Sequence, residues 1–258
     1  MARFSANLGF LWPDRPILDR IDAAAAAGFK AIELHWPYDT PAGRVREACA
    51  RNGLTLLGIN SWRGDAAKGE FGFGAVPGRE ADCQATLDQA IAYCRDAGGS
   101  AIHVMAGIVD PSRHDEALET FVANLRQAAA KAGDLTLLLE PINQRDAPGY
   151  FYSTIEEAAA ILDRVGAPNL KIMFDVYHVG VSQGDVLTRL KTWFGRIGHV
   201  QIAAVPSRAE PDEGEIAYRV IFDALDALGW DGWIGCEYKP RADTDAGLGW
   251  VEKLGATL

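Results

Sequence analysis

The chain has 258 residues, of which 48% are hydrophobic and 23% charged, a composition typical of a globular protein with one large core. Its formal net charge of -10 disfavours nucleic acids and anionic membranes as partners, because both bind basic surfaces. The first residues lack the features of a signal peptide and no apolar stretch is long enough to span a bilayer, so we expect a cytoplasmic protein with a single domain over residues 1–258.

Eight short apolar runs alternate with amphipathic segments along the chain. The runs, each predicted to be a strand, are residues 4–8, 31–34, 55–59, 101–105, 136–140, 171–175, 199–203 and 233–237. The segments predicted to be helices are residues 17–27, 43–52, 80–97, 115–132, 154–165, 185–194, 217–228 and 243–254. This strict alternation predicts parallel strands, and eight such units close into a single α/β domain, a (β/α)8 TIM barrel. A doubly wound open sheet is the alternative architecture.

One long segment, residues 61–78, breaks the alternation after the third predicted strand. Its glycines predict a loop, and long loops in compact domains are often active-site lids. In a barrel, moreover, the loops that follow strands all lie on the active face. Two interpretations stay open, a lid and a mobile surface loop. The glycines do not form a dinucleotide-binding fingerprint, which would have to open a helix near the first strand.

Four consecutive predicted strands carry an oxygen-bearing side chain near their C-terminal ends. Residues 135–139 form an apolar run that stops at Glu140, and the next three strands carry Asp175, Gln201 and Glu237. Because side chains alternate between the two faces of a strand, all four should point into the mouth of the barrel. A single carboxylate at a strand end is usually a solvated or capping residue. Four on consecutive strands predict a site.

Three carboxylates in one cavity would repel one another and raise their own pKa values unless a cation neutralised them. Glu140, Asp175 and Glu237, with the amide oxygen of Gln201, form an all-oxygen set that favours Mg²⁺ or Mn²⁺ over zinc. The five histidines are too few for a multi-zinc site. The four cysteines contain no C-x-x-C pair and are predicted to be reduced thiols.

The motifs around these residues form a familiar set. They are L-E-P-I-N at 139–143, F-D-V-Y-H at 174–178, G-H-V-Q-I-A at 198–203, P-x-R-x-E-P-x-x-G-E-I at 206–216 and G-C-E-Y-K-P at 235–240. Together they resemble the hydroxypyruvate isomerase family, whose fold is a xylose-isomerase-like TIM barrel. The resemblance runs from residue 3 to residue 248, nearly the whole chain.

The resemblance implies that Glu140 and Glu237 donate and accept protons. In related ketose epimerases, the positions that match Asp175 and Gln201 complete a metal site. Those epimerases have His where this chain has Gln201, which implies weaker metal binding here. The resemblance does not make a metal obligatory.

The implied reaction is the isomerisation of a small anionic hydroxy-oxo acid, hydroxypyruvate, to 2-hydroxy-3-oxopropanoate (tartronate semialdehyde). A base removes a proton next to the carbonyl, a cis-enediolate forms, and an acid returns a proton to the neighbouring carbon. A metal or fixed donors would stabilise the negative charge on oxygen. Two alternatives stay open. The 2-oxo-tetronate isomerases share the motifs and use a substrate one carbon longer, and a metal-dependent ketose 3-epimerase uses the same proton chemistry.

The substrate carboxylate needs a cation in this acidic protein. Arg208 is the first candidate because a guanidinium binds a carboxylate through two parallel hydrogen bonds, and Lys239 is the second because it points the same way as Glu237. A surface salt bridge is the alternative for both. His178 is either a substrate contact or a hydrogen-bonded wall residue.

Two other classes of protein are weighed against an isomerase. A DNA-repair endonuclease with a similar barrel would need several metal-binding histidines and a basic groove. A non-catalytic sugar-acid binding protein would not need two acid–base carboxylates. The sequence is compatible with a monomer and with a homo-oligomer.

Overall fold

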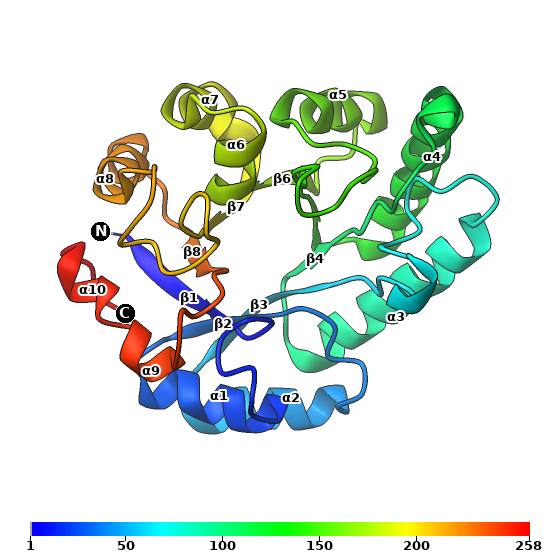
Figure 1. Ribbon diagram of the computed structural model, residues 1–258. Coiled ribbons are helices and arrows are strands. Elements are labelled where there is room, and N and C mark those ends of the chain that lie inside the picture. Colours follow the sequence, from blue (N-terminus) through cyan, green and yellow to red (C-terminus); the bar gives the residue numbers. More distant parts are fainter. Residues whose placement is uncertain (1) are drawn as a thin grey trace.

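The barrel is closed by eight parallel strands that follow one another in chain order (Figure 1). The computed structural model describes residues 2–258. The strands are β1 (Arg3–Asn7), β2 (Ala31–Leu34), β3 (Thr55–Asn60), β4 (Ala101–His103), β5 (Thr136–Leu139), β6 (Leu170–Asp175), β7 (Ile197–Ile202) and β8 (Trp233–Cys236). Each strand pairs in parallel with the next, and β8 pairs with β1. The predicted TIM barrel is confirmed, and the open sheet is excluded.

Helices form a ring outside the strands (Figure 1). They are α1 (Ile17–Ala26), α2 (Ala42–Asn52), α3 (Glu80–Ala97), α4 (His114–Ala132), α5 (Ile155–Val165), α6 (Val176–Ser182), α7 (Val186–Trp193), α8 (Tyr218–Leu228), α9 (Thr244–Gly247) and α10 (Trp250–Lys253). Short 3-10 turns lie at η1 (Ala66–Lys68), η2 (Pro111–Arg113) and η3 (Phe194–Arg196). Each predicted helix corresponds to at least one of these elements.

Two helices differ from the prediction. The helix α6 was not expected, and it begins directly after Asp175, whose side chain accepts a hydrogen bond from the backbone N–H of Tyr177 at 2.8 Å and so caps the helix. The single helix predicted over 243–254 is instead α9 and α10. Gly247 and Gly249 lie at the break, and glycine is a poor helix former.

The interior of the barrel holds polar side chains at the level of the site. Leu137 and Leu139 are fully buried on the outer face of β5, as the alternation predicts. On the inner face of the barrel, β2 buries Glu33 and β7 buries Gln201 instead. Gly235 makes room for them, because a Cβ at this position would lie 2.3 Å from Glu33 Oε1. The strands therefore leave space for chemistry rather than filling the barrel with aliphatic side chains.

The segment 61–78 packs against the barrel along its second half. Gly72 forms an antiparallel bridge with Ala106, and the backbone N–H of Ala75 donates to the Ala106 carbonyl at 2.7 Å. A Cβ on Gly72 would lie 2.4 Å from the carbonyl oxygen of Met105, so only glycine permits this approach. Phe73 is buried beside it. This part of the loop is a fixed wall of the barrel mouth.

Two expectations from composition can be compared with the fold. No helix within residues 2–258 is long and apolar enough to cross a membrane. All four cysteines are buried free thiols, as predicted.

Candidate active site

A cavity of about 370 Å³ opens at the C-terminal ends of the strands. Five of the predicted site residues line it: Glu140, His178, Arg208, Glu237 and Lys239. They follow β5, β6, β7 and β8, at the end of the barrel where active sites form in this fold. The cavity lies within the usual range for small-molecule sites. The two carboxyl groups predicted to transfer protons thus face one cavity.

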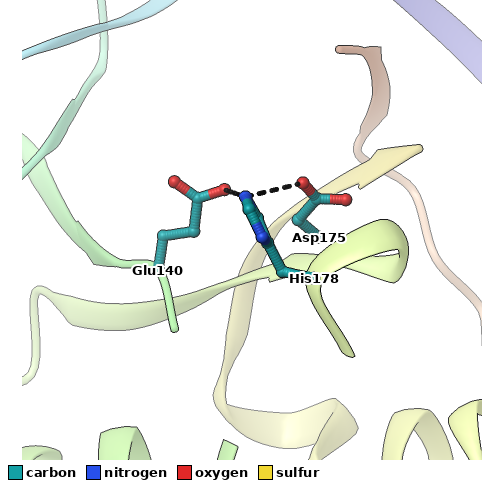
Figure 2. A group of neighbouring side chains, drawn as sticks. All are labelled: Glu140, Asp175 and His178. Atoms are coloured by element: carbon teal, nitrogen blue, oxygen red, sulfur yellow. Dashed lines mark ion pairs between the residues drawn. The ribbon is translucent and has the colours of Figure 1, made fainter. Parts of the chain in front are cut away.

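His178 lies between two of the predicted carboxylates (Figure 2). Its Nε2 is 3.7 Å from Glu140 Oε1 and 3.6 Å from Asp175 Oδ2. Its Nδ1 accepts a hydrogen bond from the backbone N–H of Asn143 at 3.2 Å, so the ring proton must sit on Nε2. Burial and the nearby charge of Arg208 lower the pKa of His178 to about 3, so the ring is neutral. His178 is therefore placed to donate a hydrogen bond rather than to ligate a metal.

Glu140 and Asp175 both have raised pKa values, as expected for carboxyl groups that repel one another in one cavity. Burial and the charges of Glu237 and Asp175 raise the pKa of Glu140 well above its ordinary value. Burial and the charge of Glu237 raise the pKa of Asp175 to about 7. Each has one buried oxygen without a hydrogen-bond partner among the described residues, Glu140 Oε1 and Asp175 Oδ2. Both groups hold a proton more readily than an ordinary carboxyl group does.

Glu237 has the opposite electrostatic environment. Burial by itself would raise its pKa, but a hydrogen bond from His35 and the charges of Arg208 and His35 outweigh burial and hold the pKa at about 2. His35 Nε2 lies 2.8 Å from Oε1, and Arg208 Nη2 donates to Oε2 at 3.3 Å. Glu237 is therefore ionised at neutral pH.

Arg208 is enclosed by aromatic rings and carboxylates. Its guanidinium carbon lies 5.0 Å from the ring centre of Phe10 and 4.9 Å from that of Tyr177. One terminal nitrogen binds Glu237 and the other lies 3.3 Å from Asp146 Oδ2. Both terminal nitrogens are thus engaged with carboxylates of the protein, so Arg208 neutralises the site itself.

Gln201 lies beside Asp175 where β7 pairs with β6. It forms a hydrogen bond with Glu33, which is not among the predicted site residues. Its Nε2 donates to Glu33 Oε2 at 2.9 Å. Because an ionised carboxylate only accepts hydrogen bonds, this contact fixes the amide and leaves Gln201 Oε1 buried without a partner. Glu33 is also paired with His199 at 3.1 Å and accepts a hydrogen bond from Ser5 at 2.5 Å. Burial opposes ionisation of Glu33, but His199 and the hydrogen bonds outweigh it and lower its pKa.

The residues present fit a hard divalent cation. Three buried oxygens without a partner, on Glu140, Asp175 and Gln201, are ligands of the kind that Mg²⁺ and Mn²⁺ prefer. Glu140, Asp175 and His178 each bring one potential ligand atom within 4.8 Å of the others. The proton on His178 Nε2 leaves the two carboxylates as the ligands of that group. Glu237 stands apart from it, with both oxygens engaged.

Four ionisable residues that line the cavity are not among the predicted site residues: His35, Arg63, His103 and Asp146. His35 directly follows β2, just as Glu140 directly follows β5. The rule that selected Glu140 would have found His35 if it had been applied to the first four strands. Arg63 and Asp146 lie in loops, and no spacing in the sequence places them here.

The raised pKa of Asp175 predicts a pH-dependent cost in stability. The folded-state pKa of about 7 lies above the ordinary 3.8, so wild-type protein should lose stability as pH rises from about 4 to about 7. Asp175→Asn cannot ionise and keeps the oxygen that caps α6. We expect this variant, in EDTA, to have the higher thermal midpoint at pH 7.5 and to lose that advantage near pH 4. Parallel curves of thermal midpoint against pH would contradict the prediction.

Known proteins match this chain over nearly its whole length. Residues 21–254 match the family described as xylose isomerase-like TIM barrel. The 2-oxo-tetronate isomerase of Cupriavidus necator is 48% identical over 98% of each chain. The hydroxypyruvate isomerase of Escherichia coli is 38% identical over 98% of this chain and 99% of its own. A crystal structure described as an AP endonuclease, family 2, from Brucella melitensis superposes with a TM-score of 0.95 at 39% identity, over 98% of this chain and 99% of that chain.

Proposed function

The chain belongs to the xylose isomerase-like TIM barrel family, and we propose that it isomerises hydroxypyruvate to 2-hydroxy-3-oxopropanoate through a cis-enediolate. The observation that carries this proposal is the pair of buried carboxyl groups, Glu140 and Glu237, that face one cavity and have pKa values shifted in opposite directions. Groups whose environments separate their pKa values are suited to act as an acid and a base. The names of the two isomerase relatives support the same class of reaction.

In the proposed mechanism, ionised Glu237 removes a proton from the hydroxymethyl carbon of hydroxypyruvate. The C–H bond breaks, a carbon–carbon double bond forms, and negative charge develops on the former carbonyl oxygen. The Nε2–H of His178 is placed to stabilise that oxygen. Glu140, whose pKa is raised, then donates a proton to the neighbouring carbon. The proton of the terminal hydroxyl passes to the former carbonyl oxygen, so that this oxygen becomes a hydroxyl and the terminal carbon becomes the aldehyde. Proton exchange with water returns Glu237 to its ionised form and Glu140 to its protonated form.

A divalent cation would fit this scheme. Glu140, Asp175 and Gln201 would hold Mg²⁺ or Mn²⁺ through their buried oxygens that have no partner, whereas His35 and Arg208 already engage both oxygens of Glu237. When bound, the cation would stabilise negative charge on the substrate oxygens.

Binding of such a cation should raise the thermal midpoint. A ligand that binds only the folded state stabilises it by an amount that grows with its concentration, so Mn²⁺ should shift the wild-type midpoint upward progressively. Asp175→Asn removes one ligand charge and should reduce the shift. Differential scanning fluorimetry across a Mn²⁺ series measures both. No shift in the wild type, or the same shift in Asp175→Asn, would exclude the cation site.

A 2-oxo-tetronate is the alternative substrate, favoured by the name of the relative that is 48% identical. It differs from hydroxypyruvate by one carbon and needs the same proton transfers. NMR in D₂O with each acid tests both candidates, because the exchanging carbon identifies the reaction. Deuterium at the neighbouring carbon of the product supports isomerisation. Exchange at a single carbon with inversion would indicate an epimerase instead.

An endonuclease is less well supported, although one solved relative carries that name. A DNA-binding barrel needs a basic groove, whereas this chain has a formal net charge of -10. The cavity contains three cations, Arg63, Arg208 and Lys239, and Arg208 is engaged with carboxylates of the protein. These charges suit one small anion rather than a phosphodiester backbone.

A further inference from the structure

The three cations of the cavity are not equivalent. Arg208 binds Glu237 and Asp146, so its charge is already neutralised. Arg63 and Lys239 form no ion pair with any residue in the described part of the chain, 2–258. An unpaired cation that lines a cavity rich in carboxylates is available to an incoming anion. Only these two side chains meet that condition among the described residues of the cavity.

Arg63 is the better positioned of the two. Its guanidinium carbon lies 4.4 Å from the ring centre of Trp36, whose indole N–H donates to the Ser61 carbonyl at 3.0 Å. The backbone carbonyl of Arg63 accepts a hydrogen bond from Gly72 at 2.7 Å, so both ends of the residue are held. Stacking fixes the plane of a guanidinium and leaves its N–H edge free to bind a carboxylate through two parallel bonds.

Lys239 offers a weaker contact. It is exposed, and its ammonium lies 5.7 Å from the ring centre of Phe10, whereas Arg63 is half-buried. Water screens an exposed charge more than a half-buried one, and an ammonium binds a carboxylate as a point charge without the planar fit of a guanidinium.

We propose that Arg63 binds the carboxylate of the substrate and thereby selects hydroxy-oxo acids over neutral ketoses. This assignment rests on the proposed function and replaces Arg208 as the residue that holds the substrate carboxylate. An anion placed against Arg208 would face Glu237 and Asp146, which already occupy that guanidinium. The loop 61–78 then has a role in this chain: its packing on β4 and the segment after it delivers Arg63 to the cavity.

The test measures binding separately from turnover. D-glycerate has the carboxylate and carbon number of hydroxypyruvate but no carbonyl to isomerise, so its dissociation constant by calorimetry reports recognition alone. Arg63→Met keeps the apolar contact with Trp36 and removes the charge. We expect it to weaken D-glycerate binding by about 10- to 100-fold, the range for losing a hydrogen-bonded charge. The KM for hydroxypyruvate should rise by more than kcat falls, and Arg63→Lys should restore part of the affinity.

Two control variants sharpen the test. Lys68→Met removes the same charge from the exposed part of the loop, where Lys68 pairs with Asp65 at 3.5 Å, and it should leave D-glycerate binding unchanged. Lys239→Met should cause a smaller loss than Arg63→Met. Equal affinity in wild type and Arg63→Met, or a larger loss in Lys239→Met, overturns the assignment. If wild-type protein neither binds D-glycerate nor turns over hydroxypyruvate, the proposed function fails together with it.

Discussion

Replacing either glutamate of the cavity with glutamine should lower kcat by at least ~10²-fold, the low end of what a positioned acid or base contributes. Glu140→Gln and Glu237→Gln keep the size of the side chain and part of its hydrogen bonding, but neither can transfer a proton. Binding of D-glycerate should change much less than kcat. Steady-state kinetics with hydroxypyruvate, together with calorimetry, measures the two effects separately.

The double variant tests whether the two groups act together. Residues that form one catalytic unit are not additive, so Glu140→Gln with Glu237→Gln should be little worse than the worse single variant. Deuterium exchange then separates the roles: Glu140→Gln retains the ionised base and should still exchange the hydroxymethyl protons without completing isomerisation. Glu237→Gln should lose that exchange. Near wild-type turnover in either single variant would refute the mechanism.

A buried glutamate outside the cavity provides the control. Glu210 is fully buried and pairs with Arg241 at 2.9 Å, where it orders the loop after β7. Glu210→Gln should affect thermal stability more than kcat. A loss of kcat in this variant as large as in Glu140→Gln would show that loss of any buried charge, rather than loss of proton transfer, explains the result.

The parts of the site that the sequence predicts depend on strand geometry. Side chains alternate with a period of two along a strand, and the ends of parallel strands meet at one edge, so Glu140 and Glu237 could be placed in one cavity from their positions alone. The same rule places Asp175 and Gln201 level with each other, as the pairing of β6 with β7 confirms. The observed helix and strand boundaries differ from the predicted ones by a few residues, but these four side chains still lie near the ends of their strands.

The protonation states of these residues could not be predicted, because they depend on which side chains of other strand ends and loops contact each carboxyl group. Glu140 and Glu237 occupy similar positions in the sequence, but only Glu237 is contacted by the side chains of His35 and Arg208. Arg63 reaches the cavity because glycines let the 61–78 segment pack closely against the barrel. Such contacts depend on the path of irregular backbone, for which a sequence has no period to follow.

Removal of the positive charge of Arg208 should also have a large effect on kcat/KM. Its charge is one of the influences that hold the pKa of Glu237 at about 2. Arg208→Met removes that charge, so the pKa of Glu237 should rise. A base must be ionised to act, and the acidic limb of the profile of kcat/KM against pH should therefore move to higher pH. Removal of one preorganised charge also weakens the field around the enediolate, and we expect kcat/KM at neutral pH to fall by about 10²-fold.

Comparison of three variants identifies the cause of that loss. Arg208→Lys keeps a positive charge, so its acidic limb should move less than that of Arg208→Met, although an ammonium cannot bind Glu237 and Asp146 with the same geometry. Arg145 lies 3.6 Å from Asp146 and forms no ion pair or hydrogen bond with Glu237 within residues 2–258, so Arg145→Met should leave the limb in place. Near-ultraviolet circular dichroism checks that each variant is folded. An unchanged limb in Arg208→Met would mean that His35 alone keeps Glu237 ionised, and the role assigned to Arg208 would be wrong.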